Sequence, residues 1–221
     1  MARLTVLAPL PPSRSSSAPA GAAMVRLLRR SRPRHRVRAL WPVPEHLEIV
    51  LAETDLPVHL VSPDPEDGDV YRAAITHPGL VVLVGLDLEA VIRELVRARD
   101  PAGRAAVREA KAADGAWFAH VARRARGLVV LSEAERARLL EIGCRTPAFV
   151  ASLDDRGAPA VNRAVTSTLA LINDPAERTL GRWASALRDS GVGPEELVAE
   201  GYGVRYVEAL DEIRRSPVGS T

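Results

Sequence analysis

Short, largely apolar runs recur along the chain and alternate with longer segments in which apolar and polar residues mix. The runs contain mainly Leu, Val and Ala, and they occupy residues 4–7, 37–40, 58–61, 80–83, 128–131 and 148–151. Runs of this length and composition predict β-strands. The runs at 80–83 and 128–131 both read Leu-Val-Val-Leu, which is typical of strands buried on both faces of a sheet.

The segments between the runs have the patterning of amphipathic helices. We expect helices at residues 22–30, 45–52, 69–76 and 88–98, and a longer one from Pro101 to about residue 125 that is broken near Gly115. Ser132 and Glu135 have the spacing of a capping box, which predicts a further helix start. Residues 161–172 are compatible with either a helix or a strand.

Buried strands that alternate with helices predict an α/β protein with a Rossmann-like, doubly wound parallel sheet and a C-terminal helical extension. We expect a sheet domain at residues 1–153, a linker at 154–174, and helices at 175–221 that pack back on the domain. Ligands of such sheets bind beyond the carboxyl ends of the strands. The loops that follow the strands are therefore the places to search for chemistry.

The charge of the chain is unevenly distributed. Residues 1–40 contain nine Arg and no Asp or Glu, although the net charge of the whole chain is only +2. Most of these arginines fall between Arg26 and Arg38, where three interpretations stay open: a solvated basic edge, a docking surface for an anionic membrane, or a nucleic-acid surface. Val25, Leu27 and Leu28 would give the membrane interpretation an apolar counterpart. Nucleic acid is disfavoured because no aromatic residue interrupts the cluster.

Cysteine and histidine patterns exclude several kinds of site. Cys144 is the sole cysteine, so neither an intrachain disulfide nor a cysteine-rich metal site can form. His59 and His77 have no second ligand at metal-binding spacing, so we expect structural roles for both, and neither a metal nor a cofactor is expected. No apolar run is long enough to span a bilayer. We expect a cytoplasmic protein, with peripheral contact at the inner membrane face left open by the arginines.

Several strand edges resemble the N-terminal, acceptor-side half of bacterial family 4 glycosyltransferases. The resemblance is carried by LAPLPPSRS at residues 7–15, HLVSPD at 59–64, VYR at 70–72, HPGLVVL at 77–83 and GLVVLSEAER at 127–136. In that family, two Rossmann-like domains of the GT-B fold face each other, and the C-terminal domain holds the nucleotide sugar. The segment between Leu153 and Pro175 is too short for such a donor domain.

The chain also departs from the family's pattern at three positions. The family's first loop usually has a Gly after the Ser near Ser15, where this chain continues with Ser and Ala. Val84-Gly85 stands where the family often has His-Asp, and Ser62 replaces a frequent Asn.

The resemblance directs attention to polar residues at the ends of the predicted strands. Ser13, Arg14 and Ser15 would donate hydrogen bonds to an anion, with a flexible polar loop as the alternative. Asp87 and Glu89 are candidate catalytic bases, with capping of the next helix as the alternative. Further candidate binding residues are Ser62, Ser132 and Glu133, although the capping box already accounts for Ser132.

These features lead to two main functional hypotheses and to a third, a small-molecule enzyme that uses the crevice beyond the strand ends for an unrelated anionic ligand. The first is a truncated glycosyltransferase-like protein that acts with a partner supplying the donor domain, or as a pseudoenzyme in sugar transfer. Its expected ligands are a nucleotide sugar or a glycan acceptor. The second is a non-catalytic interaction or scaffold module that docks through its Arg-rich N-terminal segment.

Overall fold

The computed structural model describes residues 2–31, 35–41 and 44–173. The chain divides into two compact units, residues 1–169 and 170–221. Of the second unit only residues 170–173, the end of a helix, are described. The helices expected at 175–221 therefore lie outside the described residues.

The described chain forms a six-stranded sheet in which all strands are parallel, in the order β2-β1-β3-β4-β5-β6. The strands are β1 (Arg3–Leu7), β2 (Arg36–Leu40), β3 (Leu56–Val61), β4 (Leu80–Leu83), β5 (Gly127–Val130) and β6 (Ala148–Val150). The two Leu-Val-Val-Leu runs supply β4 and β5, which pair directly and are buried throughout. The predicted fold class, a Rossmann-like parallel sheet with a C-terminal helix, is confirmed.

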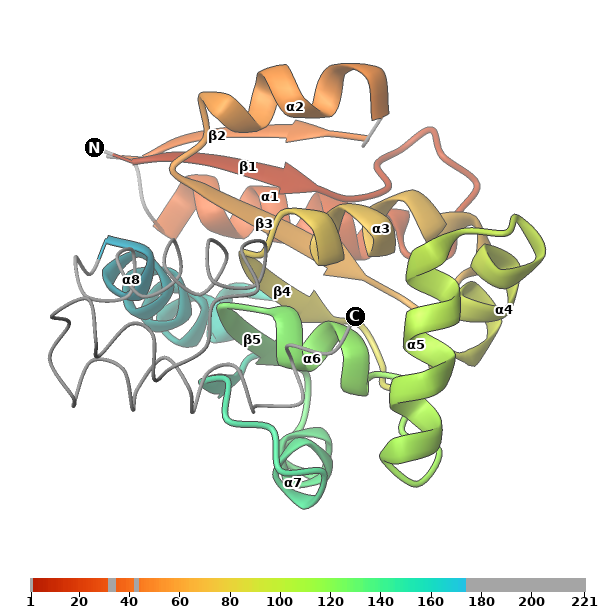
Figure 1. The fold of residues 1–221 in the computed structure, drawn as a ribbon. Helices are drawn as coiled ribbons and strands as arrows, with labels where there is room; N and C mark the ends of the chain where they lie inside the picture. Colours follow the sequence, from red (N-terminus) through yellow and green to blue (C-terminus); the bar gives the residue numbers. More distant parts are fainter. Residues whose placement is uncertain (1, 32–34, 42–43, 174–221) are drawn as a thin grey trace, which may run out of the picture. The chain divides into compact units, whose positions relative to one another are not determined.

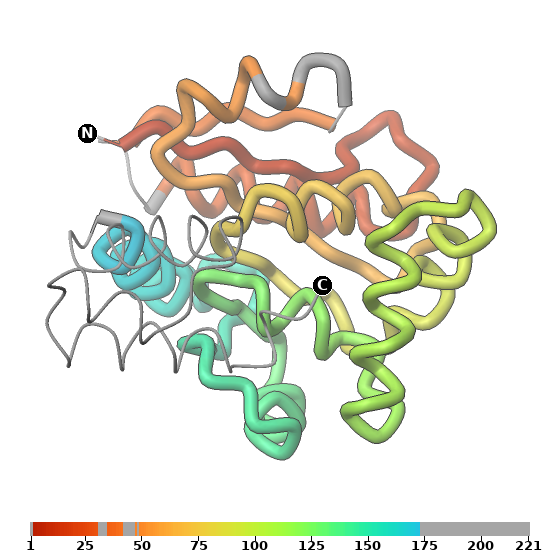
Figure 2. The backbone as a smooth tube through the Cα atoms, viewed as in Figure 1, coloured from red at the N-terminus to blue at the C-terminus, as the bar shows by residue number. Residues whose placement is uncertain are grey.

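Helices cover both faces of the sheet, as Figure 1 shows with α1 behind the strands and α3 in front. The helices are α1 (Ala18–Ser31), α2 (Pro44–Ala52), α3 (Gly68–Thr76), α4 (Glu89–Arg97), α5 (Pro101–Ala112), α6 (Ala119–Arg124), α7 (Glu133–Glu141) and α8 (Ala158–Asn173). Val81 and Leu128 on the front face join one core cluster with residues of α3, α4, α6 and α7. Figure 2 traces the backbone from β1 out to β2 and back past β1 to β3.

Helix α1 differs from its prediction in its start and in the role of its apolar residues. It begins at Ala18, four residues before the expected start, because Pro19 is tolerated in the first turn, where its missing N–H has no intrahelical partner. Val25, Leu27 and Leu28 are buried at 7%, 4% and 0% exposure. These side chains are part of the core, so they cannot be the apolar counterpart that the membrane interpretation assigned to them.

Most of the segment expected as a linker, 154–174, is helical. Helix α8 occupies residues 158–173, and it buries Val161, Ala164 and Val165 completely. The ambiguity over residues 161–172 is thus resolved as helix, and the part of α8 up to Leu169 belongs to the sheet unit. Gly127 permits this packing, because a Cβ on it would lie 2.2 Å from Thr168 Oγ1.

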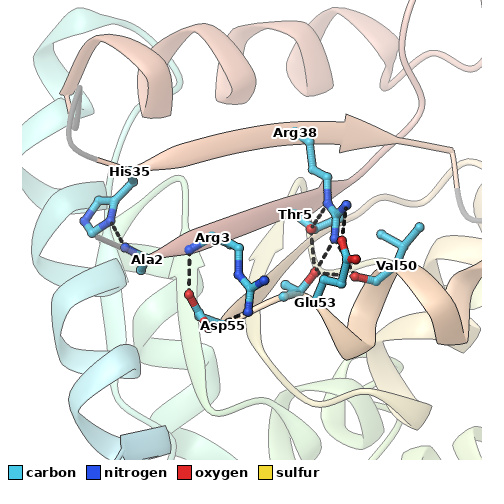
Figure 3. A network of polar contacts seen from close by, with 9 residues as sticks. Ala2, Arg3, Thr5, His35, Arg38, Val50, Glu53 and Asp55 are labelled. Atoms are coloured by element: carbon cyan, nitrogen blue, oxygen red, sulfur yellow. Dashed lines mark hydrogen bonds and ion pairs between the residues drawn. The ribbon is translucent and has the colours of Figure 1, made fainter.

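A half-buried arginine, Arg38, ties the edge strand β2 to its neighbours (Figure 3). Arg38 Nε donates to Thr5 Oγ1 at 3.0 Å, and its Nη2 donates to the Val50 carbonyl in the last turn of α2 at 2.5 Å. Thr5 and Thr54 share a hydrogen bond of 2.7 Å beside it. A cation at a helix C-terminus is favourable because it meets the unpaired carbonyls there. Arg38 therefore has a structural role and does not belong to a free basic surface.

Replacing Arg38 by Met should lower the free energy of unfolding by about 1–2 kcal/mol, because it removes the charge-assisted hydrogen bonds to Thr5 and to the Val50 carbonyl and the ion pair with Glu53. Urea unfolding followed by circular dichroism measures this. Arg36→Met is the matched control, since Arg36 lies on the same strand with an exposed side chain, and it should change stability by less than about 0.5 kcal/mol. Equal effects of the two substitutions would contradict the assignment.

Candidate functional site

The candidate site lies where the loops after β1 and β3 meet. These strands are neighbours in the sheet, but the chain leaves β1 for α1 on one face and leaves β3 for α3 on the other (Figure 1). Such a topological switch point is where doubly wound sheets bind ligands. The two loops are residues 8–17 and 62–67, and the second includes a short 3-10 turn, η1 (Pro65–Asp67).

A buried carboxylate, Asp67, joins the two loops. It is 1% exposed, and it accepts hydrogen bonds from three serine hydroxyls. Ser15 donates to Oδ1 at 2.8 Å, while Ser17 and Ser62 donate to Oδ2 at 2.6 and 2.5 Å. Asp67 also lies at the N-terminus of α3, where the helix dipole favours negative charge. The hydroxyls and the helix together compensate the cost of burying this charge.

A second carboxylate, Asp64, lies half-exposed in front of the first turn of α1. Its Oδ2 accepts from the Ser16 backbone N–H at 2.7 Å and from the Ser16 hydroxyl at 2.8 Å, and it lies 3.1 Å from Ser15 Oγ. Its Oδ1 accepts from the Glu66 N–H at 3.0 Å. Burial raises the pKa of Asp64, but these hydrogen bonds outweigh burial and hold the pKa below its ordinary value. Asp64 therefore stays ionised at neutral pH.

The arrangement is a network of donors that are already matched to the chain's own acceptors. Ser15 has a single hydroxyl proton, and its shorter contact is with Asp67 rather than Asp64. The same oxygen accepts from the Ser17 N–H at 3.2 Å. Groups of this kind at the start of a helix would bind a phosphate in many doubly wound proteins. Here the Ser16 amide and the hydroxyls of Ser15, Ser16 and Ser17 are engaged by Asp64 and Asp67.

The three residues predicted to bind an anion, Ser13, Arg14 and Ser15, do not converge on one point in the structure. The structure brings Ser15 into the carboxylate network, whereas Ser13 Oγ accepts from the Ser15 N–H at 3.2 Å within its own loop. Arg14 is exposed, and its side chain makes no hydrogen bond or ion pair with the residues that the structure describes. Ser62, from the other loop, is brought to Ser15 and Ser17 through Asp67.

The candidate bases Asp87 and Glu89 follow β4 and are engaged at the start of α4. Asp87 Oδ1 accepts from the Glu89 N–H at 3.4 Å, and Glu89 forms an ion pair with Arg93 one turn later. The N-cap residue itself is Leu88, which has no side-chain capping bond, so the Asp87 contact is made one residue before the cap position. No hydrogen bond or ion pair among residues 2–31, 35–41 and 44–173 joins either carboxylate to the serine network.

Ser132 and Glu133 stand at the start of α7, after β5. The predicted capping box is present: Ser132 Oγ accepts from the Glu135 N–H at 3.2 Å, and Glu135 accepts from the Ser132 N–H at 3.0 Å. Glu133 pairs with Arg136 on the exposed side of the helix. Since β4 separates β5 from β3, these residues lie about 10 Å or more from the switch point.

His59 is enclosed in the core of the sheet. Its exposure is 0%, its Nε2 lies 2.9 Å from the His77 carbonyl oxygen, and its Nδ1 has no partner in the described part of the chain. Burial lowers the pKa of His59 to about 4, with the bond to the His77 carbonyl opposing the effect. A neutral ring that donates to a backbone carbonyl agrees with the expected structural role.

Neither a metal centre nor a membrane span is found in the described residues. No group of three or more His, Cys, Asp or Glu side chains there could hold a metal ion. Likewise, none of the helices within those residues combines the length and the apolar character needed to cross a bilayer. Comparison of the chain with protein-family models, with curated proteins and with solved structures gives no match.

Asp67 is the central residue of the site that the sequence patterns did not reveal, although Asp64 belongs to a segment that carries the resemblance. A local signal was present, because Asp64 precedes Pro65 and Asp67 precedes Gly68, and Asp directly before Pro is typical of a helical start. Two of the three serines that Asp67 binds, Ser17 and Ser15, however, lie 50 and 52 residues away along the chain. Only the parallel pairing of β1 with β3 brings these serines to it.

Replacing Asp67 by Asn should lower the free energy of unfolding by about 2 kcal/mol, because an amide N–H₂ cannot accept from the serine hydroxyls and the charge-assisted bonds are lost. Urea unfolding measures the change. Glu66→Gln alters an exposed carboxylate in the same turn and should be nearly neutral. Retention of full stability in the Asn variant would show that the carboxylate does not hold the loops together.

Stability should fall as the pH is lowered from about 7 to 4. Unfolded His59 takes up its proton near pH 6.5, whereas the folded ring stays neutral until about pH 4. The unfolded state thus binds more protons than the folded state in this pH window. The loss of stability that accumulates between the two pKa values of His59 is roughly 3 kcal/mol. Unfolding curves measured at a series of pH values give the free energy of unfolding as a function of pH. Between pH 7 and 4 this free energy should change less steeply in His59→Gln than in the wild type. Some slope remains in that variant, because burial also lowers the pKa of His120 to about 4. Identical slopes in the two proteins would exclude His59 as a source.

Proposed function

We propose that the chain is a glycosyltransferase-like protein without transfer chemistry of its own, which takes part in sugar transfer beside a partner that supplies the donor domain. The strand-edge residues that resemble the acceptor-side half of family 4 enzymes support the kinship with sugar transfer. The observation that supports the absence of transfer chemistry is that the Asp64 carboxylate accepts hydrogen bonds from the Ser16 amide and hydroxyl, just before α1.

A nucleotide sugar would meet unfavourable electrostatics at this edge of the sheet. Its diphosphate needs N–H or hydroxyl donors and nearby positive charge. Here the Ser16 amide already donates to Asp64, and the hydroxyls of Ser15 and Ser17 donate to Asp67. A diphosphate would have to displace one carboxylate while lying close to a second. The same loops therefore disfavour a nucleotide as the ligand.

A neutral glycan is the ligand class that these loops fit better. Sugar hydroxyls donate hydrogen bonds to carboxylates and accept them from serine and arginine side chains. Asp64 is half-exposed, Ser16 bonded to it is exposed, and Arg14 is exposed two residues earlier in the same loop as Ser16, so all three can be reached from solvent. This set corresponds to the acceptor side of a transferase, where the ligand is a sugar chain and no diphosphate is bound.

The proposal is tested by adding UDP, UDP-glucose, GDP-mannose and pyrophosphate separately to the full chain in a thermal unfolding assay. None of them should raise the melting temperature, whereas a bound ligand at 100 times its Kd would stabilise the protein by about 2.7 kcal/mol. An increase with a nucleotide sugar would overturn the proposal. A neutral glycan array, read with wild type and with Arg14→Ala, tests the acceptor side, and binding lost in the variant would support it.

The Asp64→Ala variant gives the complementary result. Removal of the carboxylate frees the Ser16 amide and hydroxyl at the start of α1, so pyrophosphate should stabilise this variant more than it stabilises the wild type. Glu66→Ala is the matched control, because Glu66 is exposed in the same loop and its side chain accepts no hydrogen bond from α1. If Asp64→Ala gains nothing from pyrophosphate, Asp64 does not occupy an anion position, and the main support for the proposal is lost.

A further inference from the structure

The outer face of α1 carries a stripe of three arginines, Arg26, Arg29 and Arg30, all of them exposed. Each residue turns a helix by about 100°, so these three side chains span an arc of roughly 100°. Met24 and Leu28, which are 0% exposed, lie on the opposite side of the helix against the sheet. The amphipathic character of α1 thus separates a buried apolar face from a cationic face that meets solvent.

The charge of this stripe is almost unopposed. Helix α1 contains no Asp or Glu, and neither does the rest of residues 1–40. The one acidic contact among the described residues is the ion pair of Arg30 with Asp155 at 3.2 Å, in which the side chains are 73% and 82% exposed. A pair this exposed contributes little and exchanges readily with other anions. Arg36, exposed at the start of β2, lies close to α1 in sequence, and Arg32 and Arg34 fall outside the described residues.

The partner that fits the stripe is an extended anionic surface. A row of guanidinium groups on one side of a helix can meet many phosphate groups at once, as on the headgroup layer of an anionic bilayer. Helix α1 has no aromatic side chain on which a nucleic-acid base could stack. Its large apolar residues, Met24, Val25, Leu27 and Leu28, are buried in the core. Contact with lipid would therefore be electrostatic and superficial, without insertion into the acyl chains.

We propose that the arginine stripe of α1 docks the protein on membranes that contain anionic lipid. This surface differs from the one expected from the sequence, because Arg38 is taken up by the network at β2 and because Val25, Leu27 and Leu28 do not insert. It does not depend on the proposed role in sugar transfer. The two proposals therefore fail separately.

Co-sedimentation of the full chain with vesicles tests the proposal. The protein should bind vesicles of phosphatidylglycerol and phosphatidylcholine at 50 mM NaCl, and it should not bind vesicles of phosphatidylcholine alone. At 500 mM NaCl the binding should be lost, since the Debye length falls to a few ångströms. The variant Arg26→Gln/Arg29→Gln/Arg30→Gln should bind on the order of a hundredfold more weakly, at roughly fivefold per arginine.

The matched control removes three exposed arginines elsewhere, as Arg97→Gln/Arg104→Gln/Arg138→Gln on α4, α5 and α7. It has the same net charge as the stripe variant and should keep most of the vesicle binding. Circular dichroism checks that both variants remain folded. Equal loss in the two variants, binding to phosphatidylcholine alone, or binding that resists salt would each overturn the proposal. Tighter binding to a DNA duplex than to the anionic vesicles at the same salt would overturn it in favour of nucleic acid.

Discussion

Burial of both faces of the central strands is the constraint on which the rest of the domain depends. Every residue of β4 and β5 is buried, and helices cover the sheet on both sides. A polar side chain within these strands would lose its water without gaining a partner. In β4 and β5, polar chemistry is therefore confined to the strand ends. Buried polar side chains within the neighbouring strands all have a partner: Thr5 in β1 bonds Thr54 and Arg38, and His59 in β3 is a neutral ring that donates to a backbone carbonyl.

At the switch point, the chain supplies both the donors and the acceptors of its own polar network. Serine hydroxyls from the β1–α1 loop meet carboxylates from the β3–α3 loop, and Asp67 is buried with all of its hydrogen-bond contacts inside the protein. The network links the two halves of the sheet at the switch point, where the chain has added β2 on one side of β1 and continues with β3 on the other side. An enzyme that bound a diphosphate here would need the same serine hydroxyls and amide free. These groups can therefore either hold the two loops together or bind a phosphate, but not both.

The sequence predicted those parts of the fold whose signals are local. The Leu-Val-Val-Leu runs identify β4 and β5 without ambiguity, and the Ser132–Glu135 spacing identifies the start of α7. The start of α1 was placed too late, because Pro19 and the small residues around it carry no periodicity. Helix α8 stayed undecided because its Thr and Ser residues suit strands as well. Within the helix, Thr168 satisfies its hydroxyl by donating to the Ala164 carbonyl. The serine–carboxylate network could not be predicted, since its partners meet only through the pairing of β1 with β3.

Helix α1 runs back from the carboxyl ends of the strands, so its arginines stand away from the acidic loops. Arg26, Arg29 and Arg30 occupy its second half, near the start of β2, whereas Asp64, Asp67, Asp87 and Glu133 follow the ends of β3, β4 and β5. An anionic plane that attracts these three arginines would repel the carboxylates at the strand ends. The two sets of charges thus favour the same orientation, with the stripe nearer to the plane than Asp64 and Asp67.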